Sequence, residues 1–140
     1  MNNLVFVYGS LKRGFWNNDV LGNSKRLIEK AVTKGEFVLT NAGFPYMVRT
    51  DPQTDVVGPP ELPVLGEVYQ VTSEQVMASL DTLEGVRHGH YKRHQVEVED
   101  VETGETQVAT AYIPCDNNRT IKYPLCETAT INNQLYYEWS

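Results

Sequence analysis

Residues 4–14 read Leu-Val-Phe-Val-Tyr-Gly-Ser-Leu-Lys-Arg-Gly, an apolar run that stops abruptly at small residues. Its β-branched and aromatic residues predict a buried strand. Gly9 has no Cβ and permits a tight bend, where main-chain N–H groups can hold an anion or an oxyanion. From residue types alone, an ordinary turn between strand and loop remains the simpler interpretation.

The bend does not have the sequence of a phosphate loop or of a hydrolase elbow. Gly9 and Gly14 are spaced as in G-x-x-x-x-G, but Phe15 and Trp16 stand where Lys and Ser/Thr are required. No G-x-G-x-x-G motif follows a strand, so a dinucleotide-binding fold has no support. Ser10 lacks a Gly-x-Ser-x-Gly elbow, and we do not expect it to act as a covalent nucleophile.

Length and composition favour a small globular protein. We expect one domain over residues 1–140, with a tail from about residue 114 whose role the sequence does not indicate. A net charge of -6 argues against a nucleic-acid partner, although four cations near the start could gather in one patch. We expect these to lie on a solvated face; they are Lys12, Arg13, Lys25 and Arg26.

Several features predict a cytoplasmic protein without a membrane partner. No apolar run is long enough to span a bilayer, and the first residues lack a secretion signal. Cys115 and Cys126 are too few for a disulfide framework and lack metal-ligand spacing, so we expect reduced thiols.

The pattern of elements predicts a mixed α/β (α+β) fold with a largely antiparallel, curled sheet. We expect a short helix, broken at 22–24, over residues 20–28. Strands are predicted at 4–8, 31–40, 44–49, 64–71, 91–100 and 106–113, with loops at 51–63 and 86–90 and a bulge at Gly66. Beyond residue 114 we see no pattern, but expect Tyr136, Tyr137 and Trp139 to dock on the body.

One helix is well defined. Thr72 or Ser73 can cap its start, and Thr72 with Gln75 fits a capping box. Its apolar stripe is spaced at helical intervals and predicts core packing; the stripe is Val76, Met77, Leu80 and Leu83. Gly85 is placed to end the helix in a left-handed conformation.

Glu84 stands out among the acidic residues. It lies at the end of this apolar helix, where it faces the negative end of the helix dipole. If it is also partly desolvated, its pKa rises toward the range that a general acid/base needs. From the local sequence alone, a surface glutamate at a frayed helix end remains the simpler explanation.

Three histidines, His88, His90 and His94, lie close together. Residues two apart in a strand share a face, so His88 and His90 are the natural pair of ligands. No third ligand is placed with them, and we do not expect a zinc site.

Two motifs together give a family resemblance. The first is the stretch 5–14, and the second is Leu-Asp-Thr-Leu-Glu-Gly at 80–85, followed by Tyr-Lys-Arg at 91–93. Gly-Glu-Val-Tyr at 66–69 adds a third match. In this order and spacing, over residues 4–113, the chain resembles the γ-glutamylcyclotransferase-like family, closest to its γ-glutamylamine cyclotransferase (AIG2-like) branch.

The resemblance implies a small, largely antiparallel β-barrel flanked by one well-formed helix and short helices, with a cavity at one end. It implies an enzyme that converts a small-molecule γ-glutamyl compound into 5-oxoproline and a free amine, without metal or cofactor. Carried over by motif, Glu84 is the catalytic acid/base. The substrate-binding residues are Tyr8, Gly9, Ser10, Leu11 and Tyr91.

Three alternatives stay open at this point. The chain fits a module that binds γ-glutamyl or amino-acid head groups without turnover, or an enzyme that removes a γ-glutamyl protecting group in a biosynthetic pathway. It also fits a structural domain with a vestigial cavity. The segment between Glu84 and Tyr91 holds Arg87, His88 and His90, which leaves the departing amine open. The sequence gives no oligomeric state.

Overall fold

In the computed structural model of the chain, ten segments are described. They are residues 3–9, 11–15, 17–22, 24–35, 38–41, 45–48, 62–89, 91–114, 126–131 and 133–138. Ser10, His90, Trp139 and the predicted loop up to residue 61 lie outside the described residues.

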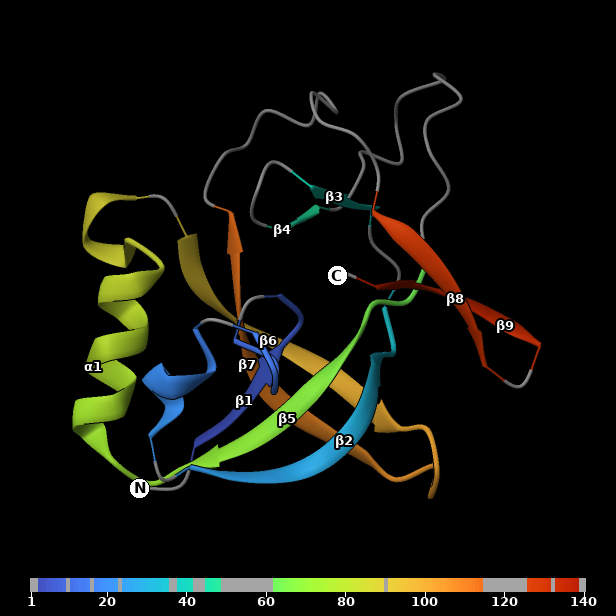
Figure 1. The fold of residues 1–140 in the computed structure, drawn as a ribbon, viewed down its shortest axis with the longest axis horizontal. Coiled ribbons are helices and arrows are strands. Elements are labelled where there is room, and N and C mark those ends of the chain that lie inside the picture. The colour runs from blue at the N-terminus through green and yellow to red at the C-terminus, as the bar shows by residue number, and fades with distance from the viewer. Residues whose placement is uncertain are drawn as a thin grey trace.

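Five strands close into a barrel in the order β1-β5-β2-β6-β7 (Figure 1). They are β1 (Asn3–Val7), β2 (Lys25–Thr33), β5 (Leu65–Val71), β6 (Tyr91–Asp100) and β7 (Thr106–Pro114). All neighbours in the barrel are antiparallel except β1 and β7, which run parallel with Val5 opposite Thr110. The predicted α+β class is confirmed.

The remaining elements surround this barrel. One α-helix, α1 (Glu74–Leu83), lies along its outside, with the short 3₁₀ helices η1 (Asn18–Leu21) and η2 (Val86–His88) (Figure 1). Two separate two-stranded sheets pair β3 (Val38–Asn41) with β4 (Pro45–Val48) and β8 (Glu127–Ile131) with β9 (Gln134–Glu138). No helix in the described segments is long and apolar enough to cross a membrane.

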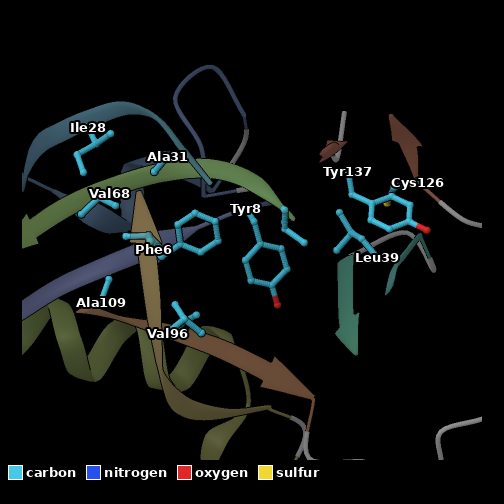
Figure 2. Close-up of a cluster of buried hydrophobic side chains, with 13 residues drawn as sticks. Phe6, Tyr8, Ile28, Ala31, Leu39, Val68, Val96, Ala109, Cys126 and Tyr137 are labelled. Carbon is cyan, nitrogen blue, oxygen red and sulfur yellow. The ribbon is translucent and has the colours of Figure 1, made fainter. Parts of the chain in front are cut away.

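The apolar run of β1 is buried on both faces. Phe6 lies with Val68 in the cluster of the barrel interior (Figure 2). The same cluster includes Val98. Val5 and Val7 point the other way and join the cluster that contains Leu80 of α1. Because both faces are covered, the run is continuous rather than alternating.

Gly66 of β5 allows β1 to approach closely. A Cβ at this position would lie 2.4 Å from the main-chain oxygen of Val7 and 2.7 Å from the Phe6 ring. The register irregularity lies on the neighbouring strand, on both sides of Ile28 in β2. One of these irregularities ends at the pair Ala31–Gly66, so the predicted bulge is present, but its extra residue is on β2; Gly66 itself allows close packing.

Two predictions in the first third of the chain are wrong. Of the described residues between 20 and 28, only Val20 and Leu21 are helical, as part of η1, and Leu27 and Ile28 belong to β2. Leu27 is exposed while Ile28 is 4 % exposed, so the pair belongs to an alternating strand rather than to a helical stripe. The predicted strand 31–40 is divided between β2 and β3, with Lys34 and Gly35 in a bend.

The helix α1 confirms its predicted end and, of the two predicted caps, selects Ser73. Ser73 is the cap, and its hydroxyl accepts a hydrogen bond from the Val76 N–H (3.3 Å), so the capping box based on Thr72 is not formed. Gly85 has φ 64° and ends the helix as expected. Leu83 is exposed, because it lies on the solvent side of the last turn.

A terminal hairpin, β8–β9, was not predicted. Tyr137 is 1 % exposed, and its N–H donates to the Pro63 carbonyl (2.9 Å). The Cys126 N–H donates to the Leu39 carbonyl (2.9 Å). The predicted docking is confirmed for Tyr137, which joins the cluster of the barrel interior.

Candidate active site

The bend that follows β1 is closed by its own main chain. The Lys12 N–H donates to the Gly9 carbonyl (3.0 Å), and Gly9 and Leu11 are both buried. The side-chain amide of Asn18, in η1, donates to the Leu11 carbonyl (2.9 Å). The bend is therefore fixed from two sides, although Ser10 at its centre lies outside the described residues.

Glu67 of β5 supplies a further anchor. Its carboxylate accepts from the Arg13 N–H (2.9 Å) and from the Tyr69 hydroxyl (3.1 Å), and it lies 3.7 Å from the Arg26 guanidinium. The Glu67 carboxylate thereby joins the segment after the bend to β5.

The predicted solvated face of cations is wrong for Lys12. Its side chain is 7 % exposed, and its ammonium lies 5.1 Å from the centroid of the Phe15 ring. Burial lowers the pKa of Lys12, although the negative charges of Glu138 and Glu67 act in the opposite direction. Nothing in the sequence around Lys12 indicated that its side chain is buried.

Tyr8 closes the end of β1 against β7. Its hydroxyl donates to the main-chain oxygen of Tyr112 (2.5 Å), and its ring stacks on Phe6 with centroids 5.9 Å apart. Figure 2 shows the ring between Phe6 and the pair formed by Leu39 and Tyr137. Tyr8 is 5 % exposed. Its packing and its hydrogen bond hold the end of β1, where the bend begins, against β7.

Glu84 caps the C-terminal end of α1. Its N–H donates to the Leu80 carbonyl (2.9 Å), and the left-handed Gly85 turns the chain away directly after it. Burial removes water from the Glu84 carboxylate and thereby raises the pKa of Glu84 to about 7. The carboxyl therefore has both protonation states available near neutral pH.

Elements that carry several of the predicted site residues meet near the end of α1. The end of α1 lies beside the start of β6 and the end of β7 (Figure 1). Leu11 and Tyr91 share one apolar cluster with Leu80, which lies one helical turn before Glu84. Tyr8 lies in the neighbouring cluster and is joined to this one through its hydrogen bond to Tyr112.

Asp81, Arg93 and Tyr112 form a polar group that the sequence did not reveal as a unit. The Arg93 guanidinium donates to both oxygens of Asp81 (2.8 and 2.7 Å), and the Tyr112 hydroxyl donates to Asp81 Oδ1 (2.7 Å). Asp81 and Arg93 both stand in the second of the quoted motifs, which was the available signal. Nothing in the sequence distinguished Tyr112.

The histidines are only partly described. His94 lies exposed on β6, opposite Ala111, while the side chain of His88 and all of His90 are outside the described parts of the chain. Within those parts, no group of three His, Cys, Asp or Glu residues is placed to hold a metal ion.

Sequence comparison gives a match over most of the chain. Residues 5–136 match the family model described as "Gamma-glutamyl cyclotransferase, AIG2-like". A protein of Vibrio cholerae, named "Putative gamma-glutamylcyclotransferase", is 36% identical over 114 residues, which cover 81% of each chain.

Solved structures share the fold. An AIG2-like protein from Mus musculus matches with a TM-score of 0.68 and 24% identity, covering 98% of this chain and 95% of that one. YkqA from Bacillus subtilis matches with a TM-score of 0.62 and 28% identity over 89% of this chain. The chain spans only 38% of the length of YkqA.

Proposed function

The chain belongs to the AIG2-like γ-glutamyl cyclotransferase family, and from this premise we propose that it converts a γ-glutamyl amine into 5-oxoproline and a free amine. The observation that carries the proposal is the position of Glu84. A carboxyl with a pKa of about 7 stands at the end of α1, inside one of the family motifs. Such a group can accept and return a proton at neutral pH.

The proposed reaction is intramolecular. The α-amino nitrogen of the substrate attacks its own γ-carbonyl carbon, a five-membered lactam forms, and the bond to the departing amine breaks. The substrate supplies the nucleophile, so the protein needs none. Holding the flexible glutamyl chain in a reactive shape can lower the barrier by several kcal/mol.

Glu84 is the proposed acid/base. A protonated amine cannot attack, so one proton must leave the α-ammonium group before the ring closes. The Glu84 carboxylate accepts that proton, and the resulting carboxylic acid gives it to the departing amine. The second proton, which the nitrogen loses as it becomes the lactam N–H, passes to solvent. One carboxyl with a pKa near the working pH performs both steps.

The bend over Tyr8, Gly9, Ser10 and Leu11 is the proposed holder of the glutamyl end. Its main-chain N–H groups can donate to the oxyanion that forms on the γ-carbonyl, or to the substrate's α-carboxylate. The carbonyls of Gly9 and Leu11 are held by the Lys12 N–H and the Asn18 amide, which supports either use, because a bend that is already fixed needs no rearrangement.

Tyr91 is the proposed wall of the substrate site. It is 9 % exposed, opens β6 and shares a cluster with Leu11. The chain between Glu84 and Tyr91 carries Arg87, His88 and His90, so this segment is the proposed determinant of the departing amine.

A product screen tests the proposal. The protein is incubated with a panel of γ-glutamyl amines and γ-glutamyl amino acids, and the products are identified by mass spectrometry. We expect 5-oxoproline and the free amine from at least one γ-glutamyl amine. Release of glutamate instead indicates hydrolysis, and binding without any product indicates a non-catalytic module; either outcome refutes the proposal.

The Glu84→Gln variant tests the assignment of the acid/base in the same assay. We expect 5-oxoproline release to be abolished while the fold is retained. A rate within about tenfold of the wild-type rate, equivalent to a barrier change of only ~1.4 kcal/mol, would exclude Glu84 from this role.

A further inference from the structure

The polar group formed by Asp81, Arg93 and Tyr112, which we call the clamp, joins three elements at one point. Asp81 is on α1, Arg93 on β6 and Tyr112 on β7. Arg93 and Tyr112 are direct partners in the β6–β7 ladder, so their side chains leave the same face of the sheet side by side. Together they present three donors to one carboxylate.

Asp81 connects the clamp to Glu84, because both residues lie at the C-terminal end of α1. The two residues are three apart on α1, so they lie on the same side of its last turn. The two parallel bonds from Arg93 fix the orientation of the Asp81 carboxylate as well as its distance. The helix dipole disfavours a carboxylate near a helix C-terminus, and the donors from Arg93 and Tyr112 offset this cost. The same hydrogen bonds join the last turn of α1 to the sheet.

Tyr112 extends the clamp to the other half of the site. While its hydroxyl donates to Asp81, its main-chain oxygen accepts from the hydroxyl of Tyr8, the residue that precedes the bend. One residue therefore has hydrogen bonds both to the turn that carries Glu84 and to the strand end that carries the bend.

The clamp is poorly suited to a purely structural role. The Asp81 side chain is 31% exposed and that of Arg93 is 45% exposed. Ion pairs with this exposure contribute little to global stability, because water and salt screen them. The two-bond geometry between Arg93 and Asp81 is better explained by a need to place the end of α1 accurately.

We propose that the clamp is a positioning device that fixes Glu84 relative to the bend after β1. The inference rests on the proposed function, since it assigns a purpose to the spacing between the acid/base and the glutamyl-binding bend. None of the three residues is expected to touch substrate. They act through Glu84 and through Tyr8.

Two charge-conserving variants test the clamp. Tyr112→Phe removes the hydroxyl and keeps the main-chain oxygen, and Arg93→Lys replaces the two-pronged donor with a point donor of equal charge. The matched controls are Tyr136→Phe on β9 and Lys92→Arg, an exposed neighbour of Arg93. We expect both clamp variants to lower kcat about tenfold or more with KM within about threefold, because small misplacements of a reacting group are costly.

A second readout does not depend on turnover. The titration of the Glu84 carboxyl carbon is followed by NMR in each variant. The clamp variants should shift its midpoint from about 7 toward 4.5, because a turn that moves away from the sheet exposes the carboxyl to water. Neither variant changes the net charge, so the shift reports on position. The controls should leave both kcat and the titration unchanged.

The outcomes separate the two proposals. If the wild type releases no 5-oxoproline, the proposed function fails, and the titration alone decides on the clamp. If both clamp variants match their controls in kcat and in the Glu84 titration, the clamp is refuted. A fall in kcat that follows a loss of folded protein, with an unchanged titration, would also refute it.

Discussion

Replacing Glu84 by Gln should stabilise the protein at alkaline pH. The pKa of Glu84 is about 7 in the folded protein against an ordinary value of 4.5, so the folded state binds more protons between these pH values. The carboxyl therefore makes folding less favourable as pH rises through this window, and its full cost is present above pH 7. A difference of about 2.5 pKa units corresponds to about 3 kcal/mol.

The assay is urea unfolding of the wild type and of Glu84→Gln at pH 5 and pH 8. The linkage predicts a gain of less than about 1 kcal/mol at pH 5 and of about 3 kcal/mol at pH 8, or roughly 10 °C in Tm for a domain of this size. The control is Glu102→Gln in the exposed β6–β7 turn, which should change stability by less than about 0.5 kcal/mol at either pH.

The reasoning fails if Glu84→Gln is no more stable than the wild type at pH 8, or if its gain is the same at both pH values. Either result would mean that the Glu84 carboxyl is well hydrated. A stabilised but inactive variant is the expected pattern for a residue kept for chemistry rather than for folding.

Three further predictions concern the frame of the site and its metal independence. Tyr8→Phe, which removes the hydrogen bond to the Tyr112 carbonyl, should cost about 1 kcal/mol in urea unfolding; no loss would contradict a role for this bond. Gly66→Ala places a Cβ 2.4 Å from a main-chain oxygen of β1 and should destabilise by more than about 2 kcal/mol, or prevent folding, whereas a wild-type Tm would contradict this packing. Chelators should not inhibit 5-oxoproline release by the wild type; loss of activity on chelation would contradict a metal-free reaction.

Parts of the fold followed from local signals. The hairpin of β6 and β7 was predictable because its strands alternate and Gly104, with φ 77°, allows its turn. The end of α1 followed from Gly85, whose left-handed backbone strongly favours glycine. The prediction of Glu84 as the acid/base came from its motif. Its burial depends on elements distant in the chain.

Other parts depend on contacts that no local pattern encodes. The hairpin β8–β9 is stabilised by main-chain bonds to Pro63 and Leu39, which are far away in the chain. Its one local signal was the turn, where Asn133 has φ 65°. The register between β6 and β7 places Arg93 beside Tyr112, and the position of α1 brings Asp81 to both, so the clamp becomes visible only in three dimensions.

The central claim is that Glu84 and the bend after β1 serve one substrate site. The most direct measurement is an NMR titration of the wild type with 5-oxoproline, which follows the amides of Gly9 and Leu11 together with the Glu84 carboxyl. The account predicts that all three respond with a single Kd. Responses at only one of the two places, or with different Kd values, would contradict it.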